Sequence, residues 1–173
     1  MSKICDNKSV GIVVWKDVKL LMIERKKYNP GFAIPAGHQD GDDSRTTAMK
    51  ELSEEVGLIA EELKEEFTET FQNTCKRENG THHEWTIYTA EKYSGEIKTS
   101  EDEVKSYSWV DEETFVLLLE KLEKFVEEQN LELKIENLSE IVKRTNESDS
   151  WKNSPGLEPV MYFIFEKLSQ YET

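Results

Sequence analysis

Three glutamates with helical spacing, Glu51, Glu54 and Glu55, are the residues of this chain best suited to chemistry. Residues three and four positions apart are neighbours on one face of an α-helix, so a helix here would crowd three carboxylates together. Carboxylates held that close repel one another unless a cation lies among them. Mg²⁺ prefers oxygen ligands and completes its shell with water and substrate phosphates. The spacing therefore predicts a metal site for chemistry on a phosphate substrate.

A solvated acidic helix face is the simpler interpretation, because the chain contains 36 acidic residues and runs of like charge are common on exposed helices. The surrounding residues favour a more specific structure. Gly57 is placed to end the helix, and Ser44 or Asp43 to cap its start. Three apolar residues recur every four positions and give the helix an apolar face beside the acidic one. These residues are Ala48, Leu52 and Val56.

The segment from Gly37 to Leu58 resembles the signature box of the Nudix hydrolases. That box has a Gly, five residues and a Glu, then seven residues and Arg-Glu-aliphatic-x-Glu-Glu-x-Gly-aliphatic. The run from Glu51 to Leu58 keeps every fixed position of the second half. The departures are Lys50 in place of the arginine, a loop after Gly37 that is one residue short, and Asp42 in place of the first glutamate.

The departures change how the box would work. Asp43 would restore the five-residue spacing but shorten the next interval to six, so we assign Asp42, because Gly41-Asp42 imitates the Gly-Glu pair usual in that place. Arginine grips two carboxylates with a planar fork, whereas lysine is a point charge. Lys50 would therefore neutralise the acidic cluster but orient it less well.

The resemblance implies an α/β fold, a Nudix-like α/β/α sandwich with a mixed sheet and extra C-terminal helices. It also implies Mg²⁺ or Mn²⁺ as cofactor, with a carboxylate taking the proton of an attacking water. Nudix enzymes often draw a base or metal ligand from a loop outside the box, which makes Glu103 and Glu101 candidates. The candidate metal-site residues are Glu51, Glu54, Glu55, Gly37 and Asp42. The candidate catalytic residues are Glu54, Lys50 and Glu103.

Substrate contacts are expected from two further places. Arg25 ends an apolar run, where it is either a phosphate ligand or a surface cation. The other place is an Asn79-Gly80 pair, a hairpin-turn signal, with a cation, ring donors and an aromatic face nearby. A nucleobase could stack on that face, although an aromatic residue such as Trp85 more often fills the core. The candidate substrate-binding residues are Arg25, Arg77, His83 and Trp85.

The cysteines and histidines do not predict a zinc site. His82 and His83 are adjacent, but no cysteine or third histidine keeps metal-ligand spacing with them. We therefore expect hydrogen-bonding or phosphate-contact roles for these rings. Cys5 and Cys75 are too few for a disulfide framework, so we expect a reduced, cytoplasmic setting.

The apolar and polar patterns predict the elements that position these residues. Val10–Trp15 and Leu20–Arg25 are expected to form a hairpin, and the acidic segment 61–66 is expected to be a helical tail or linker. Further strands are predicted at 31–35, 67–75, 82–90 and 103–110. Helices are predicted at 114–129, 131–145 and 160–171, with a Pro/Gly loop at 150–159.

Composition limits the function. The 173 residues fit one Nudix-like domain, 1–173, with a helical insertion or extension at about 120–155 that could be a partner surface, a lid or padding. The net charge of −14 argues against broad nucleic-acid binding. The chain contains no run of about 18 apolar residues, so we expect no membrane span.

We expect a pyrophosphatase acting on a nucleoside diphosphate linked to another group, with a preference for a nucleoside triphosphate. A nucleotide sugar or capped polyphosphate stays open, as does a homodimer. The alternative is a non-catalytic nucleotide-binding sensor, which the Lys50 and Asp42 departures keep open.

Overall fold

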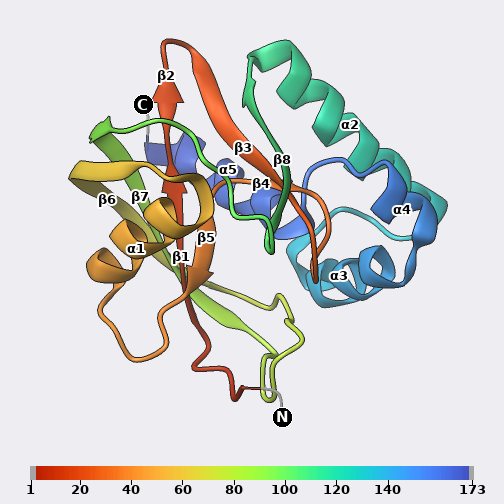
Figure 1. Ribbon diagram of the computed structural model, residues 1–173. Coiled ribbons are helices and arrows are strands. Elements are labelled where there is room, and N and C mark those ends of the chain that lie inside the picture. Colours follow the sequence, from red (N-terminus) through yellow and green to blue (C-terminus); the bar gives the residue numbers. More distant parts are fainter. Residues whose placement is uncertain (1–2, 172–173) are drawn as a thin grey trace.

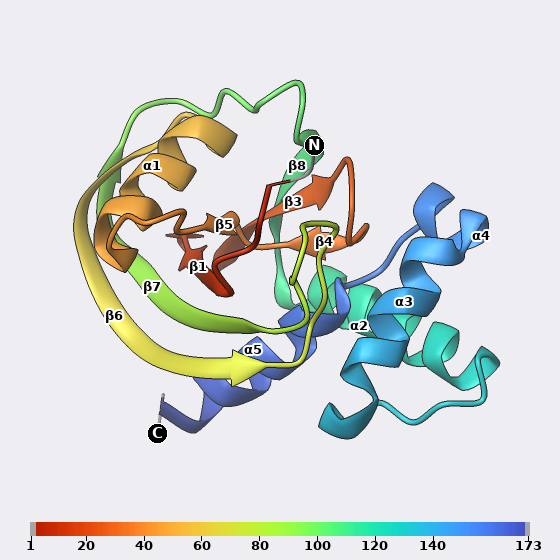
Figure 2. The same cartoon turned by 90° about the horizontal axis from the view of Figure 1, so that it is seen from below.

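Two β-sheets form the middle of the molecule, and helices lie on both outer sides (Figures 1 and 2). The computed structural model describes residues 3–171. One sheet has the order β5 (Ala36–His38), β1 (Lys8–Val13), β7 (His83–Ser94), β6 (Ile59–Phe71). It is mixed, because β1 runs parallel to β7 while the other pairs are antiparallel. The other sheet is antiparallel and contains β2 (Trp15–Lys16), β3 (Lys19–Arg25), β4 (Phe32–Ala33) and β8 (Val104–Val110).

The helices are divided unequally between the two sides. Helix α1 (Ser44–Val56) lies on one side, inside the curve of β6 and β7, and α5 (Pro159–Tyr171) lies on the other (Figure 2). The remaining helices extend from that second side. They are α2 (Glu112–Glu128), a 3₁₀ turn at Ile135–Asn137, α3 (Leu138–Glu147) and α4 (Asp149–Asn153). Among residues 3–171, no helix is long and apolar enough to span a membrane.

Strands with apolar side chains on both faces produce two separate hydrophobic cores. Successive side chains on a strand point to opposite faces of the sheet. On β3, Leu21 and Ile23 therefore pack in the α1 core, while Leu20 and Met22 pack in the core on the α5 side. The predicted α/β/α sandwich with a mixed sheet and extra C-terminal helices is confirmed.

The prediction of a helical tail or linker at residues 61–66 is wrong, because this segment belongs to strand β6. Its backbone pairs with β7 from Ile59 to Phe71, with register irregularities between Ala60 and Phe67. Most of its acidic side chains face solvent, so an exposed sheet face carries the charge pattern that an exposed helix would show.

Other elements also differ from the prediction. A tight turn does join β2 to β3, but β1 leaves the expected hairpin to pair with β5 and β7. The helix expected from residue 131 begins as α3 only at Leu138. A short helix, α4, replaces part of the predicted loop, because Ser148 caps it through the Trp151 amide and the buried Trp151 indole donates to the Pro30 carbonyl.

Candidate active site

The loop and helix of the box have the local structure that their sequence predicts. The Asp43 side chain accepts a hydrogen bond from the Thr46 amide at 2.8 Å, so Asp43 and not Ser44 caps α1. Gly57 ends the helix with a φ of 76°, a left-handed conformation that favours glycine. Gly37 packs directly against the carboxylate of Glu51, and a Cβ at position 37 would overlap it. The glycine therefore lets the carboxylate lie against the loop backbone.

Glu55 is held in one orientation by burial and by the loop. Only 4% of the residue is exposed, and its Oε1 accepts a hydrogen bond from the Ala36 amide at 3.0 Å. A buried carboxylate without such a donor would carry a large desolvation penalty. This contact fixes one oxygen of Glu55.

Glu103 approaches the box helix from a distant part of the chain. One carboxylate oxygen from each of Glu51, Glu55 and Glu103 lies within 4.8 Å of the others. The turn that carries Glu103 is attached to the end of β3, since the Lys26 amide donates to the Glu103 carbonyl at 3.0 Å and Arg25 pairs with Val104. We call these three residues the glutamate cluster.

The protonation of the glutamate cluster shows how crowded it is. The pKa of Glu55 is raised to about 8, mainly by burial; Arg25 opposes the shift and Glu51 contributes to it. Burial also raises the pKa of Glu51 to about 7, with added repulsion from Glu103 and other acids. Burial and mutual repulsion bring the pKa values of these carboxyl groups close to neutral pH. A cation that binds among them would therefore displace their protons readily. The oxygen donors, their convergence and these pKa values fit a divalent ion such as Mg²⁺ or Mn²⁺.

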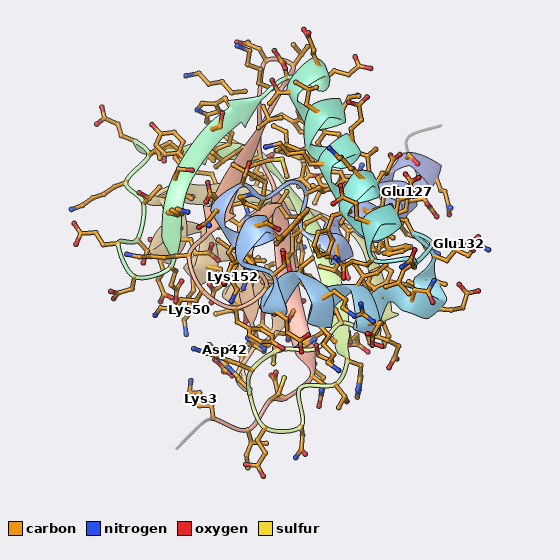
Figure 3. The ribbon with its side chains drawn as sticks, turned by 90° about the vertical axis from the view of Figure 1, so that its right-hand side faces the viewer. Lys3, Asp42, Lys50, Glu127, Glu132 and Lys152 are labelled. Carbon is orange, nitrogen blue, oxygen red and sulfur yellow. The ribbon has the colours of Figure 1, made fainter. Side chains whose placement is uncertain are left out.

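Glu54, Lys50 and Asp42, the other box candidates, lie outside the glutamate cluster found among residues 3–171. Glu54 is exposed on α1, and the glutamate cluster does not contain it. The Lys50 ammonium donates to Asp42 Oδ2 at 2.6 Å, and the two side chains lie at the surface (Figure 3). Lys50 therefore contacts the loop acid, and Asp42 is engaged in an ion pair.

A pocket of about 350 Å³ contains the glutamate cluster and all four candidate substrate-binding residues in its lining. Arg25 and Lys27 bring positive charge to it. Arg77 also lines it, but its guanidinium forms an ion pair with Asp40 of the box loop. The Trp85 ring is 4% exposed and donates to the Asn73 side chain at 3.1 Å, so it belongs to the core as well as to the pocket wall.

Glu158 is a pocket residue that the sequence pattern did not indicate. It lies just before α5 with 2% of its surface exposed, and its Oε2 has no hydrogen-bond partner among residues 3–171. Burial raises its pKa, and Arg25 opposes that shift. No local signal could have identified this residue, because Pro155, Gly156 and Pro159 around it indicate only a loop.

Comparisons with known proteins agree with this fold. The family model described as NUDIX domain matches residues 6–133, and no curated protein matches the chain. A MutT NUDIX hydrolase structure from Burkholderia pseudomallei is 23% identical, with a TM-score of 0.53 over 60% of this chain and 81% of that one. The E. coli dihydroneopterin triphosphate pyrophosphohydrolase is 19% identical, with a TM-score of 0.54 over 68% of this chain and 87% of that one. A NUDIX hydrolase from Nitrosomonas europaea is 20% identical, with a TM-score of 0.51 over 64% and 76%. At such identities the likeness concerns the fold.

Proposed function

This chain belongs to the Nudix family, and from that premise we propose that it is a metal-dependent hydrolase of nucleotide pyrophosphate bonds. The substrate is a nucleoside diphosphate linked to another group. The observation that carries this proposal is the convergence of Glu51, Glu55 and Glu103 within 4.8 Å in the lining of a pocket of about 350 Å³. Pockets of about this size and larger accommodate small-molecule ligands.

The chain's own residues divide the work at this site. When bound, Mg²⁺ or Mn²⁺ shields the phosphate charge and lowers the pKa of an attacking water. Glu51 and Glu55 would hold the cation, with Glu51 packed against Gly37 and Glu55 fixed by the Ala36 amide. Glu103 is the exposed member of the cluster, so it can take the proton of the water and pass it to solvent. Glu54 is the alternative base.

The charge and size of the pocket support a phosphate-bearing nucleotide as substrate. Arg25 and Lys27 offer cations to a polyphosphate, and Glu158 offers a buried carboxyl group to hydrogen-bond donors of a base or sugar. We prefer a nucleoside triphosphate, with nucleotide sugars and capped polyphosphates as the other substrates to test. A cytoplasmic location fits both a nucleotide substrate and the two free cysteines, Cys5 and Cys75.

A product-release screen over nucleotides with Mg²⁺ tests this function directly. We expect a nucleoside monophosphate and a second phosphate-bearing product from at least one substrate class, and no product when Mg²⁺ and Mn²⁺ are removed. The competing function is a nucleotide sensor, which the Lys50–Asp42 pair favours because it replaces the usual arginine and glutamate. Metal-dependent binding without any product, across all classes, would establish the sensor instead.

Substitutions of Lys50 test whether this residue supports catalysis, with a smaller expected effect on kcat. Lys50→Arg should preserve or raise kcat, because a guanidinium can keep the contact with Asp42 and also form the two-pronged contact that the family uses. Lys50→Gln is the matched control, since it removes the charge and should lower kcat. A loss of more than about tenfold for the arginine variant, with the fold intact, would mean that the shortened loop requires lysine.

A further inference from the structure

Four side chains beside the glutamate cluster form a second group of metal-ligand type. Cys5, His38, Cys75 and His83 each offer one ligand atom, and these four atoms lie within 4.8 Å of one another. Cys5 and His83 are buried, and the other two are half-buried. The sequence shows no metal-ligand spacing around His83, and the fold brings these four residues together from separate parts of the chain.

Backbone contacts hold the two cysteines in place. The Cys5 amide donates to the Glu78 carbonyl at 2.8 Å, which ties the N-terminal segment to the loop between β6 and β7; the two run side by side in Figure 1. The Cys75 amide donates to the Gly80 carbonyl at 2.8 Å, closing that loop. A Cβ at position 80 would overlap Cys75 Sγ. Gly80 therefore leaves the space that the thiol occupies.

The hydrogen bonds around the ligand atoms are those that orient metal ligands. His83 Nδ1 lies 2.8 Å from the Asn73 carbonyl, an acceptor, so the proton resides on Nδ1. His83 Nε2 is then left unprotonated, 3.3 Å from Cys5 Sγ. The Asn7 amide donates to Cys5 Sγ at 3.3 Å, a contact that stabilises a thiolate. Metal-bound histidines commonly donate their second ring nitrogen to a backbone carbonyl in this way.

His38 supplies an independent indication that a cation binds among these four side chains. Its Nε2 is buried and has no hydrogen-bond partner within the described chain, residues 3–171. An imidazole with an unpaired buried nitrogen, set among two thiols and a second imidazole, lacks a partner that a cation would provide.

We propose that Cys5, His38, Cys75 and His83 bind one Zn²⁺ ion in a closed tetrahedral site. Two cysteines with two histidines is a donor set typical of structural zinc. A tetrahedron with zinc's bond lengths has a sulfur–nitrogen edge of about 3.6 Å, and Cys5 Sγ lies 3.3 Å from His83 Nε2, close to that length. Binding releases the two thiol protons to solvent, and two thiolates balance the charge of the ion.

A zinc ion at this site would hold together one side of the pocket, which His38, Cys75 and His83 line. The proposal of a zinc site does not depend on the proposed hydrolase activity. The ion would join the N-terminal segment, the box loop and the 72–82 loop. Arg77 follows Cys75 closely and pairs with Asp40, which follows His38. Four protein ligands would leave no open position for a water. The ion would therefore order the pocket and take no part in bond cleavage.

Zinc content and cobalt spectroscopy of the reduced, full-length protein test this proposal. We expect about one Zn²⁺ per chain after exchange into Mg²⁺ buffer. Replacement by Co²⁺ should give tetrahedral bands in the visible spectrum and a thiolate-to-cobalt charge-transfer band. Cys75→Ser should lose the zinc and the charge-transfer band. His82→Asn, which changes an adjacent histidine outside the cluster, should keep both.

The glutamate cluster could also bind these ions, so the experiment must separate the two sites. Glu51→Gln should keep the zinc and the charge-transfer band, because oxygen ligands produce no thiolate band. If Cys75→Ser does not fold, the wild-type protein decides alone: chelation should lower its Tm and expose two thiols to a thiol reagent, and Zn²⁺ should reverse both. Reduced protein that binds no zinc, a cobalt spectrum without the thiolate band, or thiols equally reactive with and without zinc would each overturn the proposal.

Discussion

Glu55→Gln should reduce kcat by at least about a hundredfold while the fold is retained. The substitution removes the charge of the most buried member of the glutamate cluster and so weakens the cation that activates water. Glutamine keeps an oxygen that can accept the Ala36 amide hydrogen bond, so the loop need not rearrange. Steady-state kinetics at saturating Mg²⁺, on whichever substrate the screen identifies, measure the effect. Turnover equal to that of the parent would remove Glu55 from the metal site.

Stability measurements show whether that loss is chemical or structural. Without Mg²⁺, the variant should be as stable as the parent or more stable, since a neutral amide replaces a buried carboxyl whose pKa is raised to about 8. The rise in Tm that Mg²⁺ gives the parent should become smaller in the variant. Glu120→Gln is the matched control, because it changes an exposed helical glutamate on α2 and should alter neither property.

The Mg²⁺-free protein should lose stability as the pH rises from 6.5 to 8, and Mg²⁺ should abolish most of this loss. Glu55 and Glu51 have folded-state pKa values of about 8 and about 7, above the ordinary value near 4.5 that they take when unfolded. In this window the folded state holds protons that the unfolded state has released, so the free energy of unfolding falls with pH. One proton contributes about 1.4 kcal/mol per pH unit, which gives about 2 kcal/mol over the window. For a chain of this size, that corresponds to a decrease in Tm of roughly 4–8 °C.

The histidines act in the opposite direction to the carboxyls, mostly below this window. The pKa values of His38 and His83 are lowered by burial, so their contribution to stability rises with pH and levels off about one unit above the ordinary value of 6.5. It offsets part of the carboxyl loss at the lower end of the window and leaves the carboxyl loss alone at the upper end. Thermal unfolding at several pH values, with and without Mg²⁺, measures the slope, and Glu55→Gln should flatten it. A Tm that is constant from pH 6.5 to 8 without Mg²⁺ would show that the cluster is already ionised.

The sequence by itself determined the features that depend on short stretches of chain. The N-terminal cap, which the sequence narrowed to Ser44 or Asp43, the Gly57 end and the apolar face of α1 are interactions between residues a few positions apart. The continuous apolar run of β3, Leu20 to Ile23, similarly requires that both faces of its sheet be covered. Such local patterns depend on backbone geometry alone, which is why the loop–helix box could be predicted in detail.

Only the tertiary structure decided which distant side chains meet. Glu103 joins the glutamate cluster because the turn before β8 is hydrogen-bonded to the end of β3. Cys5, His38, Cys75 and His83 converge because β1 lies between β5 and β7 and carries the N-terminal segment to the 72–82 loop. These contacts depend on strand order and register, which are determined jointly by many residues far apart in the chain. A short segment of sequence does not contain this information, so the sequence alone could not predict that these two cysteines and two histidines lie together.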